Sequence, residues 1–379
     1  MVKENNLKTQ FLKLVKIDSP SNAEAAIMHY LAQWFRSRGW KPTFDDAGKK
    51  IGGEAGNLIV KIPGNVKNVP TILLNAHVDT VITGKGVKPR ITRGVVFSDG
   101  TTALGADDKA GVAAILEVLH YLKTNHVPHG DILVVLSVAE EIGLKGAKAL
   151  DIKKLKADFG YVLDGGKANV IYNQAPFQNN IEAHIFGRAA HAGTHPEKGI
   201  SAIKVAAEAI AKMRLGRIDF ETTANIGLIK GGTATNIVAE LVEIKGEARS
   251  RNFVKLNRQT QSICRALSRA CSLHGAKYQC KVNLAYRAFE IEPGETVFKV
   301  AEAAARKLKM KPVARPTGGG SDANIFNAAG IPCVILGLGA RNLHSNREKI
   351  ALKDLTKGGT LLLQIVKEVV NWTDFLKKR

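Results

Sequence analysis

Two adjacent acids follow a short apolar run, and this arrangement narrows the folds that the chain can adopt. Residues 131–138 read DILVVLSV, and Glu140 and Glu141 follow after a single alanine. A run of this length and composition predicts a buried β-strand. Carboxylates at the end of a buried strand are costly in free energy unless a positive charge lies beside them. A metal ion would supply that charge and would let one acid act as a ligand and the other as a general base.

A second strand pattern, residues 71–79 (TILLNAHVD), ends in His77 and Asp79. Because side chains alternate along a strand, these two side chains point the same way. The Asp79 carboxylate can then accept the second N–H of the His77 imidazole, which is how metal-binding histidines are commonly oriented. This segment predicts a further ligand position at a strand end.

Three other segments place acids or a histidine at the end of an apolar or helical pattern. They are Asp107 and Asp108 before the helical pattern of residues 112–119, Asp164 in the strand pattern of residues 158–166, and His344 after the apolar residues 332–337. Strands that alternate with helices up to residue 166 predict an α/β domain with a largely parallel sheet. Ligands bind such sheets outside the carboxyl ends of the strands, where these side chains fall.

In identity and order, these segments resemble the dinuclear zinc peptidase and amidohydrolase family that includes peptidase T, carboxypeptidase G, aminoacylase and succinyl-diaminopimelate desuccinylase. The matching blocks are His77 with Asp79, residues 105–109, Glu140 with Glu141, residues 164–166, and His344 with Glu348. Any one block alone would be weak, but the set is specific and extends over most of the chain. Residues 105–111 and 140–149 resemble peptidase T most closely.

The resemblance implies a site for two divalent metal ions, with zinc expected and manganese or cobalt as alternatives. The implied ligands are His77 and Asp164 for one ion, Glu141 and His344 for the other, and Asp107 as the bridge. Glu140 would be the general base that takes a proton from water, and Asp79 would orient His77. A shift of one residue in the acidic loop would make Asp108 the bridging ligand instead.

Each of these residues alone has a simpler interpretation. His77 could be a hydrogen-bonded core histidine, and His344 could be a loop residue bonded to backbone. Glu140 and Glu141 could be an acidic pair that interacts with a helix dipole. Together these interpretations require several coincidences of residue type and order, so the metal site is favoured.

The pattern changes after residue 176, where an inserted domain is expected. Strands are predicted at residues 181–186, 240–249 and 277–284, and helices at residues 199–213 and 253–274. The order β-α-β-β-α-β predicts a split βαβ sandwich of α+β type. We expect a catalytic domain of residues 1–176 and 288–379 and a lid of residues 177–287. The resemblance implies that the lid dimerises, so a homodimer is expected.

His191 resembles a family histidine that polarises the scissile carbonyl, so it is a candidate donor to the oxyanion. A histidine in a turn is the alternative interpretation, and His195 fits that role better. Asn236 and Arg249 match segments that contact substrate in relatives. Arg249 could hold a substrate carboxylate with two hydrogen bonds, or it could form a surface salt bridge.

Gly319 and Ser321 lie in a glycine-rich segment, residues 317–324 (TGGGSDAN), that opens a predicted helix. Backbone N–H groups at a helix N-terminus can receive a substrate carboxylate. The alternative is that Ser321 is an ordinary N-cap.

Size and composition support a two-domain protein. The chain has 379 residues, of which 45% are hydrophobic, enough for more than one core. We find no apolar run of about eighteen residues and no signal-peptide pattern, so a cytoplasmic protein without membrane contact is expected. Four cysteines, Cys264, Cys271, Cys280 and Cys333, lack the spacing of a metal knuckle, and we expect reduced, structural thiols.

The formal net charge of +21 comes partly from local basic blocks such as residues 153–156, 306–311 and 377–379. These blocks lack the interleaved aromatic residues of a single-strand-binding surface. A solvated basic surface is favoured, with weak attraction to nucleic acid at low salt and no specific nucleic-acid partner. A nucleic-acid-associated protein with a decayed site is disfavoured because the ligand set is intact.

These motifs favour metal-dependent hydrolysis of peptide bonds in short peptides, as by an aminopeptidase acting on tripeptides. The sequence departs from peptidase T in two places, with Ala-His-Ala-Gly around His191 and without a histidine after the glycines at residues 318–320. An N-acyl-amino-acid amidohydrolase or a carboxypeptidase on the same scaffold is therefore the alternative. Glutamyl-type aminopeptidases are disfavoured because the insertion here follows Asp164.

Overall fold

The computed structural model describes residues 2–372, and the chain divides into two compact units. The large unit consists of Met1–Gln174, Glu290–Thr317 and Ser321–Arg379, and the second unit, called the lid, consists of Ala175–Phe289 and Gly318–Gly320. The lid boundaries expected at residues 177 and 287 differ from these by two residues each. The glycine segment at 318–320 was expected in the catalytic domain and groups with the lid instead.

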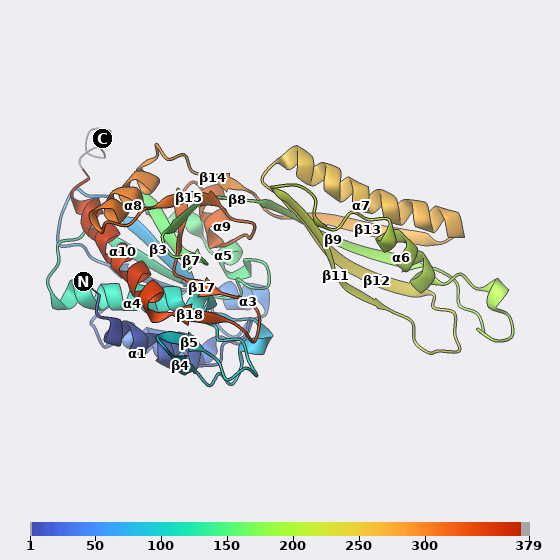
Figure 1. The fold of residues 1–379 in the computed structure, drawn as a ribbon, viewed down its shortest axis with the longest axis horizontal. Coiled ribbons are helices and arrows are strands. Elements are labelled where there is room, and N and C mark those ends of the chain that lie inside the picture. The colour runs from blue at the N-terminus through green and yellow to red at the C-terminus, as the bar shows by residue number, and fades with distance from the viewer. Residues whose placement is uncertain (1, 373–379) are drawn as a thin grey trace. The chain divides into compact units, whose positions relative to one another are not determined.

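A nine-stranded sheet forms the centre of the large unit (Figure 1). Its strands are β1 (Thr43–Phe44), β2 (Leu58–Ile62), β3 (Ile72–His77), β6 (Ile132–Ser137), β7 (Phe159–Gly165), β8 (Val170–Ala175), β14 (Phe289–Glu290), β15 (Val313–Pro316) and β16 (Cys333–Gly337). The order is β1-β2-β6-β3-β7-β16-β8-β14, with β15 beside β8. β3 pairs in parallel with β6 and β7, and β7 pairs in parallel with β16. This arrangement confirms the predicted α/β fold.

Helices cover both faces of this sheet (Figure 1). They are α1 (Glu4–Val15), α2 (Ala25–Arg36), α3 (Ala47–Ile51), α4 (Ala106–Thr124), α5 (Lys145–Ala149), α8 (Thr296–Lys307), α9 (Asp322–Ala328) and α10 (Leu352–Val370), with short 3-10 turns η1 (Ile82–Gly84) and η2 (Ile152–Lys154). α4 packs on β3 and β7 in one layer with α1, α8 and α10, whereas α9 packs on β16 and β7 beside α5. Every residue of β3 and β16 is buried, as expected for strands covered on both faces.

A small antiparallel sheet fixes the loop that carries His344. Its strands are β4 (Arg90–Thr92), β5 (Val95–Phe97), β17 (Ala340–Arg341) and β18 (Lys349–Ala351). They run in the order β17-β18-β5-β4. Because β17 and β18 pair with each other, the residues between them form a closed loop. The sheet thus joins His344 to a segment more than 240 residues earlier in the chain, since Ile350 pairs with Val96.

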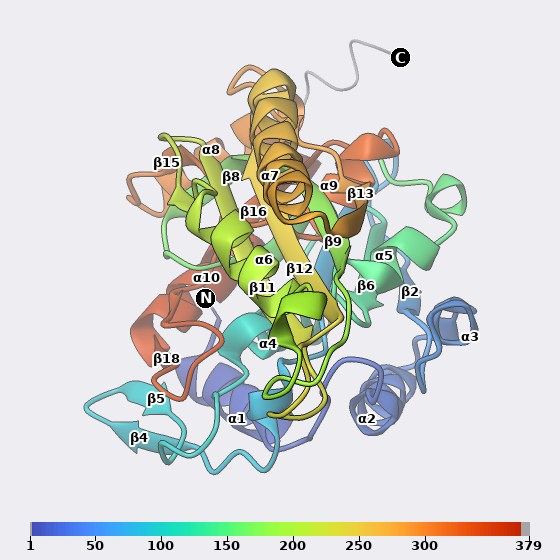
Figure 2. The ribbon, with the colours of Figure 1, turned by 90° about the vertical axis from the view of Figure 1, so that its right-hand side faces the viewer.

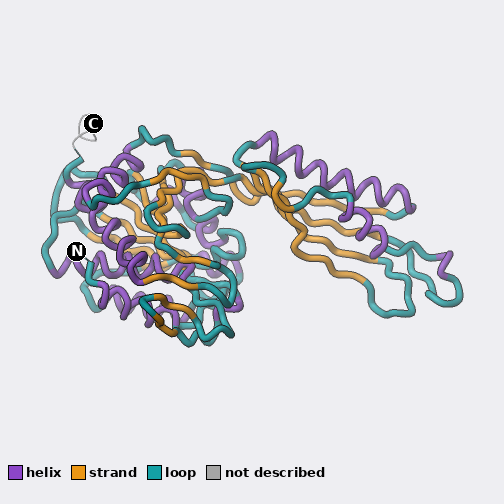
Figure 3. The backbone as a smooth tube through the Cα atoms, viewed as in Figure 1, coloured by secondary structure: helices purple, strands orange, loops and turns teal. Residues whose placement is uncertain are grey.

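The lid is a five-stranded antiparallel sheet with two helices on one face (Figures 2 and 3). Its elements are β9 (Phe177–Phe186), β10 (Gly216–Arg217), β11 (Thr222–Gly231), β12 (Leu241–Ser250), β13 (Lys277–Tyr286), α6 (Ala202–Ala211), α7 (Phe253–His274) and the 3-10 turn η3 (Pro196–Lys198). The strand order is β10-β11-β12-β9-β13. Its core contains Ile181 and Ile185 from β9 together with Ile263 and Leu267 from α7. The lid has the predicted α+β character, and β10 is an additional short strand.

Element bounds follow the sequence pattern closely where the pattern is strong. α7 has the predicted bounds, 253–274, and α6 is shorter at each end than the predicted 199–213. The final helix, α10, ends at Val370, and the basic block 377–379 lies outside the described residues. Among the helices of residues 2–372, none has the length and apolar character needed to cross a bilayer.

Candidate metal centre

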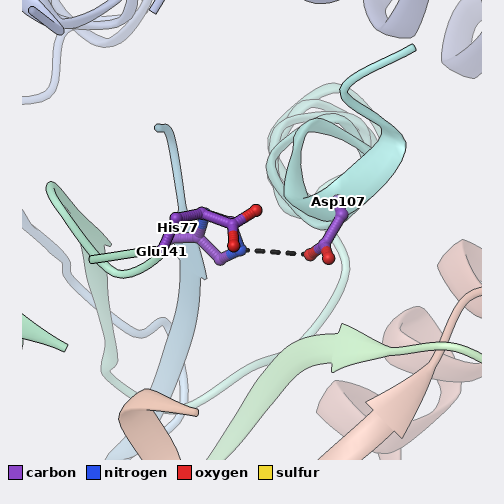
Figure 4. Close-up of side chains that lie close together, drawn as sticks. All are labelled: His77, Asp107 and Glu141. Atoms are coloured by element: carbon purple, nitrogen blue, oxygen red, sulfur yellow. Dashed lines mark hydrogen bonds and ion pairs between the residues drawn. The ribbon is translucent and has the colours of Figure 1, made fainter. Parts of the chain in front are cut away.

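Side chains of ligand type meet where β3 ends and α4 begins (Figure 4). His77 is the last residue of β3, Asp107 lies in the first turn of α4, and Glu141 lies in the turn after β6. One nitrogen or oxygen atom from each residue lies within 4.8 Å of the other two. Three segments far apart in sequence therefore form one group that could hold a metal ion.

The carboxylate of Asp107 lies between two imidazoles. His77 Nε2 is 3.2 Å from one of its oxygens, and His344 Nε2 is 3.2 Å from the other. Asp164 Oδ1 is 4.0 Å from His77 Nε2, and Glu141 Oε2 is 3.0 Å from His344 Nε2. The structure thus brings all five implied ligands together, in two groups that share Asp107.

Hydrogen bonding at His77 leaves its Nε2 free to act as a ligand. Nδ1 lies 2.9 Å from the backbone carbonyl of Asp79, which can only accept, so Nδ1 carries the proton of the neutral ring. Nε2 then directs a lone pair toward an Asp107 oxygen, an arrangement that a cation between the two atoms would stabilise. Glu141 Oε1 is buried without a hydrogen-bond partner among the described residues. Imidazole nitrogen and carboxylate oxygen together suit zinc, manganese or cobalt.

Electrostatics at the centre also favour a bound cation. Burial raises the pKa of Glu140 well above its usual value, and the nearby Asp322 and Glu141 raise it further. The pKa of Asp164 is raised by burial and by Asp107. Burial opposes ionisation of Asp107 as well, but the adjacent His344 and His77 side chains lower its pKa. Buried acids of this kind, grouped around histidines, are typical of functional sites.

Two carboxylates hold the turn that carries Glu140 and Glu141. The Asp79 carboxylate accepts the N–H of Glu140 at 2.9 Å and the N–H of Glu141 at 3.2 Å. Glu24 accepts the N–H of Ala139 at 3.0 Å. Ala139 has a φ of 51°, in the left-handed region that non-glycine residues seldom adopt. Successive N–H groups thus point at buried acids, which fixes the direction of the Glu140 and Glu141 side chains.

A third carboxylate, that of Glu348, holds the loop before Asp107. Its two oxygens accept the N–H of Gly105 at 2.9 Å and the N–H of Asp107 at 3.0 Å. Asp108, the alternative bridging ligand, accepts the N–H of Gly111 at 3.0 Å, whereas Asp107 contacts both histidines. His344 itself has a φ of 59° and a side chain that is 52% exposed. The metal centre is therefore more exposed to solvent at His344 than at His77.

A family model matches residues 73–368 of the chain, and its description is peptidase family M20/M25/M40. The chain belongs to this peptidase family. The matched residues include the five implied metal ligands and the whole of the lid. The resemblance to dinuclear metallopeptidases is thereby confirmed.

Two solved structures have the same fold as this chain over nearly their whole length, and a sequence relative matches over a similar extent. An aminopeptidase PepT from Bacillus cereus is 44% identical, covers 97% of this chain and 99% of its own, and superposes with a TM-score of 0.84. A tripeptidase from Staphylococcus aureus is 41% identical, covers 98% of this chain and 100% of its own, and has a TM-score of 0.90. Peptidase T from Salmonella typhimurium is 27% identical over 407 residues, covering 95% of this chain and 98% of its own.

Three other predicted site residues, His191, Asn236 and Arg249, lie in the lid. His191 is exposed, and its Nδ1 accepts the N–H groups of Gly193 and Thr194. Asn236 lies close to it in the lid, since its carbonyl accepts the N–H of Ala192. Arg249 forms two hydrogen bonds with the Glu247 carboxylate, at 2.8 and 2.9 Å, which is the salt-bridge alternative.

Ser321 acts as the N-cap of α9. Its hydroxyl accepts the N–H of Ala323 at 3.2 Å, and its own N–H donates to the Asn324 side chain at 3.0 Å, a capping box. The Ser321 side chain is buried, so the observed contacts are those of the N-cap alternative. Gly319 groups with the lid rather than with the large unit.

Two features of the centre differ from what the sequence suggested. The acceptor closest to His77 Nδ1 is the Asp79 backbone carbonyl, since the Asp79 carboxylate lies farther away, at 3.4 Å. Glu24 was not among the predicted site residues, yet it is fully buried and accepts the N–H of Ala139.

Proposed function

We propose that this chain is a two-metal aminopeptidase that hydrolyses tripeptides. The observation that carries the proposal is the Asp107 carboxylate with one histidine at each oxygen, which suits a bridging ligand. The relatives that are 44% and 41% identical are described as an aminopeptidase PepT and a tripeptidase. Because these relatives align with nearly the whole chain, they support a short peptide as the substrate of this chain as well.

In this proposal His77, Asp164, Asp107, Glu141 and His344 would hold two divalent ions. When bound, the ions would polarise the scissile carbonyl and make water more acidic. Zinc is the proposed metal, with manganese and cobalt as alternatives, because the nitrogen and oxygen ligands suit all three.

Glu140 is the proposed general base. Its carboxylate takes a proton from the attacking water and delivers it to the leaving amine nitrogen. The side chain is buried, with 9% of its surface exposed, so bulk water does not compete for that proton. Burial raises the pKa of Glu140, and bound cations would favour the ionised form that accepts the proton. Asp79 fixes the Glu140 backbone through the N–H at 2.9 Å.

His191 is the proposed donor to the oxygen of the scissile carbonyl. Its Nδ1 accepts two backbone N–H groups at 3.1 Å, so the proton of the neutral ring lies on Nε2. A neutral N–H that faces a developing oxyanion stabilises the transition state more than the ground state. Asn236, in the neighbouring lid segment, is proposed to contact the substrate. We also propose a homodimer through the lid and a cytoplasmic location, on the resemblance alone.

A digest of mixed peptides tests this proposal. Protein loaded with zinc, manganese or cobalt is incubated with di-, tri- and tetrapeptides, free and N-acylated, and products are identified by mass spectrometry. Release of the amino-terminal residue from free tripeptides is the expected result. Removal of the acyl group, confined to the N-acylated peptides, would make the chain an amidohydrolase, and release of the carboxyl-terminal residue would make it a carboxypeptidase. Either outcome would overturn the aminopeptidase assignment.

A further inference from the structure

Two of the four cysteines form a close pair in the lid. Cys264 lies on α7, Cys280 lies on the edge strand β13, and their Sγ atoms are 3.3 Å apart. Both side chains are partly exposed, and both residues are free thiols. Neither has a role in the proposed hydrolysis. A disulfide requires about 2.05 Å between the sulfur atoms, so a small side-chain movement would bring the pair to bonding distance.

One basic side chain beside the pair favours a thiolate. Arg265 follows Cys264 on α7, and α7 contains no acidic residue. Basic side chains near a cysteine stabilise the thiolate, which is the nucleophilic form. A hydrogen bond from Cys280 lowers the pKa of Cys264 to about 7, and Arg265 adds to this effect. The same contact raises the pKa of Cys280.

The other two cysteines are buried, unlike the pair, and serve as internal controls. Cys271, also on α7, has 1% of its surface exposed, and Cys333, in β16, has none. Burial raises the pKa of both thiols. Buried thiols with raised pKa values react slowly with oxidants.

We propose that Cys264 and Cys280 form an oxidation site, where a peroxide converts the two thiols into a disulfide that ties α7 to β13. The Cys264 thiolate attacks one peroxide oxygen, which leaves a sulfenic acid on Cys264 and releases water. The Cys280 sulfur then attacks the Cys264 sulfur, the S–S bond forms, and a second water leaves. The two sulfurs together lose two electrons, and hydrogen peroxide accepts them.

The tryptic peptides of this segment make the reaction simple to follow. Trypsin cleaves after Arg258, Arg265, Arg269, Lys277 and Lys281. Cys264, Cys271 and Cys280 therefore fall on three different peptides, residues 259–265, 270–277 and 278–281. A cross-link between the first and the third peptide identifies the proposed disulfide without ambiguity.

The experiment uses the full chain, reduced, freed of reductant and treated with equimolar hydrogen peroxide near pH 7. Two of the four thiols are expected to disappear, with peptides 259–265 and 278–281 cross-linked, and dithiothreitol is expected to restore both. Equal oxidation of Cys271 or Cys333 would overturn the proposal. A cross-link between two chains, or oxidised Cys264 without any cross-link, would also overturn it.

Two variants separate the steps. Cys280→Ser is expected to stop at the sulfenic acid on Cys264, which a dimedone adduct on peptide 259–265 would detect. Cys271→Ser changes a thiol on the same helix and is the matched control, expected to form the cross-link at the wild-type rate. A Cys280→Ser protein without any sulfenic acid on Cys264 would overturn the assignment of Cys264 as the attacking thiolate. The wild-type peptide map keeps the proposal testable if either variant folds poorly.

Discussion

The metal centre and the lid hold their functional side chains in opposite ways. In the metal centre, the backbone of the catalytic turn is bound by acids far away in sequence: Glu24 is 115 residues from Ala139, and Asp79 is 61 residues from Glu140. In the lid, the side-chain contacts of His191 and Arg249 are local, since each side chain binds a group two residues away. The first geometry depends on the whole fold, and the second depends on one loop or one strand.

This difference predicts how each region responds to substitution. In the metal centre, loss of a distant carboxylate leaves a buried N–H without its acceptor, which costs about 1–3 kcal/mol. In the lid, loss of an exposed partner exposes a group to water, which can replace the lost bond. We therefore expect substitution of supporting acids in the large unit to have large effects on activity or stability, although these acids do not touch substrate. Substitution of ion pairs in the lid should have small effects.

The largest effect is expected from Glu140→Gln. The amide cannot accept a proton from water, so kcat on a tripeptide should fall by about 10²–10⁴-fold, while the metal content is retained. Steady-state kinetics and elemental analysis of the same preparation check both points. Glu117→Gln, another buried acid of the large unit, is the matched control and should keep near-normal turnover. Near-normal turnover of Glu140→Gln would exclude Glu140 as the base.

Glu24→Ala should give the next largest effect. It removes the acceptor of the Ala139 N–H, so the turn carrying Glu140 and Glu141 loses one of its two supports. Loss of such a supporting group commonly costs about 10–100-fold in metal affinity or activity. Competition with a chromogenic chelator measures the metal affinity independently of catalysis. Glu24→Gln keeps an acceptor oxygen and should retain most of the affinity; equal losses in the two variants would contradict the positioning role.

Stability should depend on pH through Glu24. Burial raises its pKa from 4.5 to about 7, and the nearby Asp79 contributes. Between these values the folded protein holds a proton that the unfolded chain has released, so this contribution is fully present below pH 4.5 and is lost as pH rises through 7. The wild type should lose on the order of 2 kcal/mol relative to Glu24→Gln between pH 5 and pH 8. Denaturant unfolding at constant metal content measures the difference, and parallel pH profiles would refute it.

The smallest effect is expected from Arg249→Gln in the lid. The guanidinium pairs with Glu247, and both side chains are partly exposed, at 28% and 33%. Such pairs contribute less than about 1 kcal/mol, so the free energy of unfolding should change by less than that and KM should stay within about threefold. Glu247→Gln is the matched control and should behave alike. A tenfold rise in KM in Arg249→Gln alone would show that Arg249 holds the substrate carboxylate.

Sequence patterns predicted the parts of the fold that local physics determines. The buried strands β3, β6 and β7 are continuous apolar runs, and α7 carries a strong amphipathic pattern with an asparagine cap and a terminal glycine. The bounds of β11 were not predicted because its sequence, TTANIGLIKG, contains two glycines and an asparagine. The strand is also exposed over most of its length. Its existence followed from the order of the other elements, but its bounds did not.

The candidate site was likewise predictable only in part. His77, Asp107, Glu141, Asp164 and His344 were accessible because each stands at the end of an apolar pattern or in a family block. The backbone partners of the supporting acids were not accessible. Glu24 and Glu348 bind backbone N–H groups, and a backbone acceptor leaves no residue-type signal at the donor position. Only the fold reveals which N–H each buried acid reaches.

The most direct test of the central claim is the number of metal ions bound by the chain. Metal-free protein is titrated with zinc and the bound ions are counted by native mass spectrometry, for the wild type and for Asp107→Asn. Two ions per chain are predicted for the wild type, with turnover that requires both, and weakened binding of both ions is predicted for the variant. A single ion in the fully active wild type, or two tightly bound ions in Asp107→Asn, would contradict a centre in which Asp107 joins the two metal sites.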